Sequence, residues 1–315
     1  MGTRIIVIAG PTASGKSALA LGLAEALGGT VINADSMQVY RDLAVVTARP
    51  GPEELARAPH RLYGELDGAE LCSAARWAGF AGAAIAAARA AGSLPILCGG
   101  TGLYLRTLLY GIAPVPAIPD EIRQAARQCH AELGGVAFQT ELARLDPEAA
   151  ARLKPGDSQR LIRAYEVITA TGRPIADWQR SQPLAAADFD PLVVTLLPPR
   201  DALYAAIDAR FAGMVAAGAL AEVEKLMARR LDPALPVMKA VGVPELSAYL
   251  KGEIALETAI SQAQQASRRY AKRQFTWFRH QMPGALVINE QYSINLPGQV
   301  CQIICKGLDP ETASR

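Results

Sequence analysis

The chain has 315 residues, half of them hydrophobic, which is enough for one large domain or two unequal domains with packed cores. Its net charge of +2 gives no argument for a nucleic-acid partner, so any basic surface has to be local. Five cysteines without a secretory segment do not suggest a disulfide framework, and no apolar run has the length of a membrane helix. We therefore expect a cytoplasmic protein without a membrane partner.

The first motif lies close to the start of the chain. Residues 10–17 read Gly-Pro-Thr-Ala-Ser-Gly-Lys-Ser, the P-loop pattern G-x-x-x-x-G-K-S, between a predicted strand at 4–10 and a predicted helix at 15–27. In this context successive backbone N–H groups face a phosphate, and the helix N-terminus adds partial positive charge. Lys16 adds a point charge, and the Ser17 hydroxyl can bind Mg²⁺. The motif identifies neither the phosphate compound nor the group transferred.

Two further strands are predicted, at 30–34 and 94–98. Helical composition follows at 73–91 and at 102–110. Strands that alternate with helices indicate an α/β fold, with a parallel sheet flanked by helices and joined by right-handed crossovers.

Polar residues follow both of these strands. Asp35 comes after the second strand, and Thr101 lies in the glycine-rich run 99–102 after the third. Because ligands bind at the carboxyl ends of strands in open α/β sheets, we expect both residues near Lys16. Asp35 can accept a proton or bind Mg²⁺, but it can equally be a turn residue. Thr101 can donate to a phosphate oxygen or cap the next helix.

The composition changes at 113–119, where three prolines indicate an extended linker. From 120 to about 180 the pattern is helix and loop, and a strand at 192–197 then returns the chain to the sheet. Helices are predicted at 200–217, 219–230 and 254–280, with a last strand at 286–288. The domain assignment is therefore 1–112 with 186–290 for the P-loop core, 113–185 for a helical insertion and 291–315 for a C-terminal tail.

Two predicted helices carry clustered basic residues. Arg160 and Arg163 share a face and suit phosphate or a polynucleotide, but a solvated face with Glu166 pairing to Arg163 explains them equally. Five basic residues lie within 268–279, and like charges four residues apart favour a bound anion. Here too an ordinary solvated basic face is the alternative.

Together these segments resemble the bacterial tRNA dimethylallyltransferases, also called tRNA isopentenyltransferases. The matching motifs are collinear over about residues 4–280 and comprise the P-loop, D-S-M-Q-V-Y at 35–40, T-A-R-P at 47–50, P-H-R-L at 59–62, G-G-T-G-L-Y at 99–104, Q-R-L-I-R-A at 159–164, A-V-G at 240–242 and residues 268–277. Many kinases share the P-loop, but its combination with D-S-x-Q-x-Y and G-G-T-G-L-Y is specific.

The resemblance implies prenyl transfer from dimethylallyl diphosphate to the N6 amine of the adenosine 3′ of the anticodon (position 37) in tRNA. Diphosphate leaves, and Mg²⁺ assists. Asp35 matches the family's general base, and Thr101 matches a residue near the diphosphate and the target base. The positions that match diphosphate-binding residues are Thr12, Ala13, Ser14, Gly15, Lys16, Ser17 and Arg210, with Ser17 as the metal ligand. The resemblance does not decide the length of the prenyl donor.

The resemblance also implies contacts to the anticodon arm of tRNA. The matching positions are Asp35, Ser36, Met37, Gln38, Thr101, Arg123, Gln159, Arg160, Leu161, Ile162, Arg163, Arg268, Arg269, Lys272 and Arg273. The helical insertion matches a domain that grips the anticodon arm, and we expect a monomer. The chain departs from the family at Val46, where Gly is usual, and at Val243-Pro244-Glu245, where Tyr and a basic residue are common.

Three other functions stay open from the sequence. They are a P-loop kinase of a small metabolite or nucleotide, a prenyltransferase acting on free AMP or ADP, and a non-enzymatic RNA-binding module. No strand of the Walker B type, with a terminal Asp beside the P-loop, supports the kinase, although Asp35 is open to that interpretation.

Overall fold

The computed structural model describes residues 2–181 and 188–308, with side chains up to residue 303. The chain divides into two compact units, Met1–Leu109 with Ala187–Arg315, and Tyr110–Ala186. The second unit overlaps the insertion assigned to 113–185, and that assignment stays a prediction. The boundary assigned between 185 and 186 lies outside the described residues.

The first unit contains the sheet. Its strands are β1 (Thr3–Ala9), β2 (Gly29–Asn33), β3 (His60–Arg61), β4 (Leu94–Gly99), β5 (Phe189–Leu196) and β6 (Leu286–Ile288). They pair in parallel in the order β3-β2-β4-β1-β5-β6. Ile6 of the central strand β1 lies opposite Ile96 of β4 and Leu192 of β5. The α/β fold with a parallel sheet is therefore confirmed.

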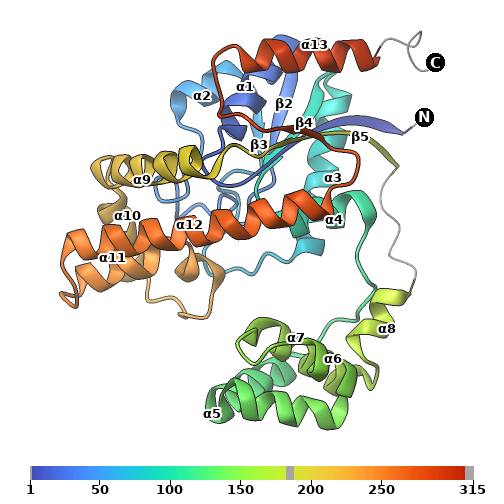
Figure 1. Cartoon of the computed structure of the whole chain (residues 1–315), viewed down its shortest axis with the longest axis vertical. Helices are drawn as coiled ribbons and strands as arrows, with labels where there is room; N and C mark the ends of the chain where they lie inside the picture. Colours follow the sequence, from blue (N-terminus) through green and yellow to red (C-terminus); the bar gives the residue numbers. More distant parts are fainter. Residues whose placement is uncertain (1, 182–187, 309–315) are drawn as a thin grey trace. The chain divides into compact units, whose positions relative to one another are not determined.

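Helices flank this sheet, and the α-helices among them are labelled in Figure 1. They are α1 (Lys16–Leu27), α2 (Pro52–Arg57), α3 (Ala74–Ala90), α4 (Gly102–Tyr110), α9 (Arg200–Ala216), α10 (Ala219–Ala228), the 3₁₀ turn η1 (Pro236–Lys239), α11 (Val243–Leu250), α12 (Leu256–Gln281) and α13 (Leu296–Leu308). Helices α9 to α12 pack on one another in a group that carries one wall of the candidate site (Figure 1).

Helix α13 belongs to the core of this unit, although the sequence assignment sets 291–315 apart as a tail. It runs beside α1, and its residues Leu296 and Val300 are buried in the same cluster as Leu19 and Leu23. The side-chain amide of Gln291 donates to the carbonyl of Ala13 at 3.4 Å. The segment after β6 therefore covers α1 and contacts the P-loop.

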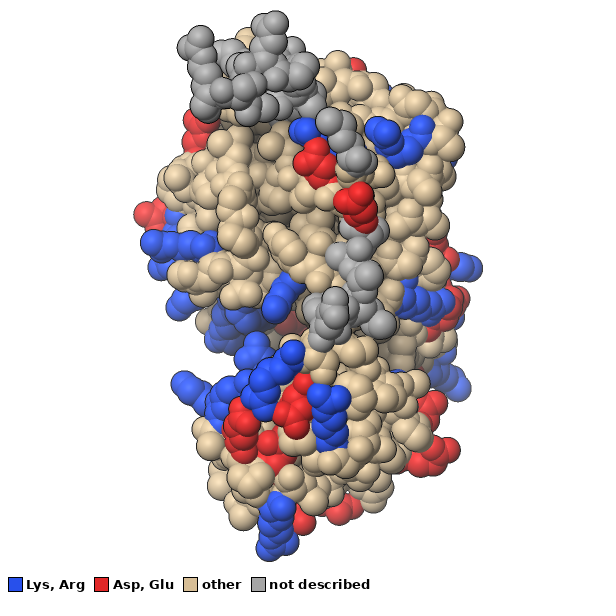
Figure 2. Space-filling model, turned by 90° about the vertical axis from the view of Figure 1, so that its right-hand side faces the viewer, with Lys and Arg blue, Asp and Glu red and all other residues tan. Residues whose placement is uncertain are grey.

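The second unit is built from α5 (Asp120–Leu145), α6 (Pro147–Arg152), α7 (Ser158–Thr171) and α8 (Ile175–Arg180). Helix α5 is broken at Gly134, whose φ of 71° and ψ of 166° are not helical. Phe138, Leu142 and Leu161 are fully buried at the centre of this unit. Figure 2 shows Lys and Arg side chains interspersed with Asp and Glu on the face it displays, so neither sign covers that face.

Among the described residues, no single helix has the length and apolar composition needed to cross a membrane. One bent pair, α9 with α10, meets those two requirements only when its helices are taken together across a bend of 67°.

Candidate active site

The P-loop joins the end of β1 to the start of α1. Gly10 and Gly15 have φ of 150° and 88°, and Ala13 has φ of 63°, so the loop turns through left-handed backbone conformations. A Cβ on Gly10 would stand 2.6 Å from the carbonyl oxygen of Leu196, which explains why this position needs glycine. The backbone of the loop thus closes against β5 and curls in front of α1.

The loop brings together groups that an anion would satisfy. The Ser14 hydroxyl is buried and has no hydrogen-bond partner among the described residues. Burial lowers the pKa of Lys16, the neighbouring Cys98 and Asp35 oppose this shift, and the Arg210 charge adds to it. Burial also lowers the pKa of Arg210, whose guanidinium donates to the Thr12 hydroxyl. Two cations that burial disfavours, beside an unpaired hydroxyl, form a site suited to a phosphate compound.

Asp35 and Thr101 lie beside each other at the carboxyl ends of β2 and β4, as the sequence predicts. The Thr101 hydroxyl accepts the backbone N–H of Ser36 at 2.9 Å. The Asp35 carboxylate accepts the N–H of Met37 at 2.9 Å, so Asp35 is also the turn residue of the alternative interpretation. Both roles are compatible, because a carboxylate has further acceptor positions after making that one bond.

Asn33 orients this turn, and the sequence reasoning missed it. Its side chain is fully buried. Its side-chain oxygen accepts the backbone N–H of Asp35 at 2.8 Å. Its side-chain NH₂ group donates to the backbone carbonyls of Asp35 and Leu62, each at 3.0 Å. A polar residue at the carboxyl end of a fully buried strand is the signal that would have identified it.

Gln274 of α12 links the P-loop to the glycine-rich run, and this link also escaped the sequence reasoning. Its side-chain oxygen accepts the N–H of Thr12, and its NH₂ group donates to the carbonyl of Gly100, each at 2.8 Å. A Cβ on Gly100 would overlap Gln274, and a Cβ on Gly102 would overlap the Trp277 ring. Gly100 and Gly102 therefore let α12 approach the strand ends closely.

A cavity of about 270 Å³ lies in front of these loops, within the first unit. Its polar lining comprises Thr12, Asp35, Ser36, Thr47, Arg210, Lys239, Ser267, Tyr270 and Arg273, and its apolar lining comprises Met37, Val46, Ile207, Phe211, Met214, Ala240 and Val241. Lys239 is a lining cation that no motif indicated. Burial and the Asp35 charge raise the pKa of Tyr270, so its hydroxyl stays protonated and can donate a hydrogen bond.

The basic residues predicted on α12 differ in their surroundings. Arg268 pairs with Asp208, and Arg269 donates to the Gln265 side chain at 2.8 Å. Arg273 lies over the Tyr270 ring at 5.6 Å, and Lys272 is exposed.

The side-chain amide of Gln38, which was predicted to contact tRNA, donates to the carbonyls of Thr47 and Ala48, so it supports the cavity wall.

The predicted tRNA contacts of the second unit lie on α5 and α7. Arg160 pairs with Asp157 at 3.2 Å, and Arg163 pairs with the buried Glu166 at 3.3 Å, which is the pairing of the alternative interpretation. Leu161 is fully buried and Ile162 partly buried, so a contact at Leu161 would use its backbone. The exposed Gln159 precedes them on α7, and Arg123 pairs with Asp120 at 3.7 Å on α5.

The residues at the P-loop suit an Mg²⁺ ion that is bound mainly by the phosphate oxygens of a substrate. In the described parts of the chain, no cluster of three His, Cys, Asp or Glu side chains could hold a metal alone. Ser17 is exposed at the start of α1 and hydrogen bonds to the thiol of Cys98, whose pKa burial raises to about 11. Mg²⁺ commonly takes one or two protein ligands and completes its shell with phosphate and water.

Comparison with known proteins decides the family. A family model described as IPP transferase matches residues 38–281, and one described as isopentenyl transferase matches residues 3–70. The chain belongs to the IPP transferase family. The chain is 59% identical over 288 residues to the tRNA dimethylallyltransferase of Rhodospirillum rubrum, and the match covers 91% of this chain and 88% of that relative. It is 60% identical over 280 residues to the one of Rhodopseudomonas palustris, covering 88% and 87%.

Solved structures show the same IPP transferase architecture. The full-length tRNA isopentenylpyrophosphate transferase of Bacillus halodurans has 32% identity and a TM-score of 0.72, with 99% of both chains covered. A eukaryotic dimethylallyltransferase acting on tRNA has 27% identity and a TM-score of 0.81, covering 97% of this chain and 79% of that one. The likeness therefore extends over both units of the chain.

Proposed function

We propose that this chain transfers the dimethylallyl group of dimethylallyl diphosphate to the N6 amine of adenosine 37 in tRNA and releases diphosphate. Relatives named tRNA dimethylallyltransferase that are 59% and 60% identical support the reaction. The observation that carries the proposal is one cavity in which Arg210 and Thr12 adjoin Asp35 and an apolar wall. The cavity therefore offers a cation for an anionic leaving group, a carboxylate that can act as a base, and an apolar surface for a hydrocarbon chain.

The diphosphate is held by the P-loop. Lys16, Arg210 and the unpaired Ser14 hydroxyl would surround it, together with Thr12 and the backbone N–H groups of Ala13, Gly15 and Ser17. As the bond from the allylic carbon to oxygen breaks, negative charge grows on the departing diphosphate. Groups already oriented toward it stabilise that charge without rearrangement. Ser17 would hold Mg²⁺, which supplies further neutralisation of the diphosphate when bound.

Asp35 is the proposed general base. The N6 nitrogen attacks the allylic carbon, the carbon–oxygen bond breaks, and Asp35 takes one proton from N6. The bonds from Asn33 to the backbone of Asp35 and from Met37 to its carboxylate hold this side chain at the cavity. Because an exocyclic adenine amine is a weak nucleophile, alignment of N6 with the carbon contributes as much as the base.

The tRNA would be bound through its backbone and the target base. The exposed cations of α12, including Lys272 and Arg273, and the arginines of α7 suit phosphate contacts. Ser36, Met37 and Thr101 adjoin Asp35 and would contact the nucleotide that enters the cavity. Adenosine 37 has to leave its stack to reach Asp35, as in other enzymes that modify a base.

A pair of labelling experiments tests this function. The protein is incubated with bulk tRNA and dimethylallyl diphosphate labelled in the prenyl group and, separately, with ATP labelled in its γ-phosphate. We expect label in tRNA from the prenyl donor alone, and none in a control tRNA with guanosine at position 37. Phosphate transfer from ATP, or prenyl transfer to free AMP but not to tRNA, would contradict the proposal.

A further inference from the structure

Apolar residues of α9 line the cavity on both sides of Arg210, and those beyond it form an apolar end. Ile207, Arg210, Phe211 and Met214 line the cavity and lie three, four and seven residues apart, so they share one face of the helix. Arg210 marks the diphosphate end, because it contacts Thr12. Met214 lies about 6 Å further along the axis, since four residues rise about 1.5 Å each. A five-carbon chain fits that distance.

Val46 faces α9 across this end of the cavity. Its side chain is 6% exposed and lines the cavity together with Phe211. Both side chains converge on Gly242, where a Cβ would stand 2.9 Å from Phe211 Cε2 and 3.3 Å from Val46 Cγ1. Gly242 has φ of 100°, and its backbone packs directly against these two side chains. A longer occupant would therefore meet Val46, Phe211 or the backbone.

Glu222 of α10 fixes the backbone that carries Val46. One carboxylate oxygen accepts the N–H of Ala44 at 2.6 Å and of Val45 at 2.9 Å, and the other accepts the N–H of Val46 at 2.8 Å. Charged acceptors make the stronger class of hydrogen bond, and this one carboxylate satisfies three successive donors. The wall at Val46 is thus held by a residue that does not line the cavity.

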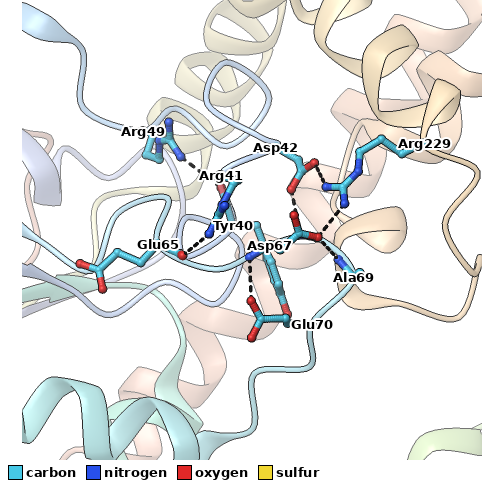
Figure 3. A network of polar contacts seen from close by, with 10 residues as sticks. Tyr40, Arg41, Asp42, Arg49, Glu65, Asp67, Ala69, Glu70 and Arg229 are labelled. Atoms are coloured by element: carbon cyan, nitrogen blue, oxygen red, sulfur yellow. Dashed lines mark hydrogen bonds and ion pairs between the residues drawn. The ribbon is translucent and has the colours of Figure 1, made fainter.

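A second contact from the same part of the chain reinforces this arrangement. Arg229 follows α10 seven residues after Glu222, which is two helical turns on the same side. Its guanidinium pairs with Asp42, and with Asp67 at 2.6 Å (Figure 3). Gln38 binds the other end of the segment through the carbonyls of Thr47 and Ala48. Segment 42–48 is therefore held at both ends and in the middle.

We propose that Val46, positioned by Glu222, closes the apolar end of the cavity and limits the donor to a five-carbon prenyl chain. Val46 is a specificity-determining residue and Glu222 a positioning residue for it. The inference rests on the proposed function, because it assigns the apolar end to the prenyl group of that donor. The adenine is instead contacted by the polar residues around Asp35, at the turn after β2.

The test pairs a smaller side chain with a longer donor. V46A deletes two carbon atoms, and the matching donor is an analogue of dimethylallyl diphosphate lengthened by two carbons at its far end. One methylene in an apolar pocket commonly changes kcat/KM by about 10-fold or more. We expect wild type to prefer the natural donor by at least that factor, and V46A to shift the ratio of the two kcat/KM values by about 10-fold toward the longer one. V46I should weaken use of the natural donor.

E222Q tests the positioning role with nearly unchanged size. The amide has one acceptor oxygen, and its NH₂ group faces backbone N–H donors, so the Val46 wall loosens. The donor ratio should shift in the same direction as in V46A but less. E224Q is the matched control, because Glu224 is an exposed carboxylate on the same helix. Its donor ratio should equal that of wild type.

The outcomes separate this inference from the proposed function. If wild type transfers neither donor to tRNA, the proposed function fails. If wild type is active and V46A keeps the wild-type donor ratio, or changes only the KM for tRNA, the length limit is wrong. Dissociation constants of the two donors, measured by competition without tRNA, decide the matter for a folded variant that has lost turnover. An E222Q ratio equal to that of E224Q would overturn the role of Glu222.

Discussion

The side-chain oxygen of Gln274 accepts the backbone N–H of Thr12 at 2.8 Å, across 262 positions of sequence. The same amide donates to Gly100, so one buried residue of α12 joins the P-loop to the loop that carries Thr101. The helix whose basic residues are proposed to contact tRNA is therefore bonded directly to the loop proposed to hold diphosphate. A shift of α12 would move both loops together.

Removal of this amide should affect both stability and transfer. In Q274A the N–H of Thr12 and the carbonyl of Gly100 lose their partner, and each buried unpaired group costs about 1–3 kcal/mol. We expect a lower free energy of unfolding in urea and a slower single-turnover transfer. Q265A is the control, because Gln265 is exposed on the same helix. Equal behaviour of the two variants would show that the Gln274 bridge contributes nothing.

Asp35 can be tested without disturbing its turn. Asn keeps an oxygen that accepts the N–H of Met37 but cannot take a proton from N6. We expect D35N to unfold at the wild-type urea concentration, to bind dimethylallyl diphosphate normally, and to lose about 10²- to 10⁴-fold in transfer rate. D35A should lose the turn bond as well. A near-normal single-turnover rate in D35N would remove Asp35 as the base.

Local motifs and topology made part of this site predictable. The P-loop is recognisable from eight consecutive residues, and Asp35 and Thr101 follow because parallel strands deliver their carboxyl ends to one edge. The strands β1, β2 and β4 are buried apolar runs, which composition alone identifies.

The supporting residues were not predictable in the same way. Asn33, Gln274 and Glu222 act through contacts with segments that are distant in sequence, and no spacing rule records such a contact. The C-terminal helix was missed for a related reason, since its burial depends on the apolar surface of α1 rather than on its own composition. Val46 illustrates the converse: its backbone does not have positive φ, so this position does not require glycine.

The glycines that face α12 should be distinguishable from glycines in open helices. A Cβ at Gly102 would overlap the Trp277 ring, so G102A forces α12 away and should lower the unfolding free energy by about 1–3 kcal/mol. Gly79 of α3 has nothing within 4 Å of the position that an alanine methyl would take, so G79A should instead raise stability by about 0.5–1 kcal/mol. Urea titration of both variants checks the difference. Stabilisation by both would indicate that helix propensity, rather than the approach of α12, decides the effect.

Helix α13 should contribute measurably to the stability of the first unit. Leu296 is 2% exposed against α1, and truncation of a buried leucine commonly costs about 2–5 kcal/mol. Ile294 lies two residues earlier and is 84% exposed, so I294A should change stability by less than about 0.5 kcal/mol. Thermal and urea unfolding of L296A and I294A measure the contrast. If L296A is as stable as I294A, α13 is not part of the core.

The arginines of α7 should reveal tRNA binding through its salt dependence. Each phosphate contact contributes about 0.7–0.9 to the slope of log affinity against log salt, because binding releases counterions. R160A and R163A should each weaken tRNA binding and reduce that slope by about this amount. R144A is the matched control, since Arg144 is 71% exposed in the same unit and pairs with Glu141 in the same i,i+3 geometry as Arg160 with Asp157. Slopes that are unchanged in R160A and R163A, or reduced equally in R144A, would assign α7 a solvated basic face instead of a tRNA contact.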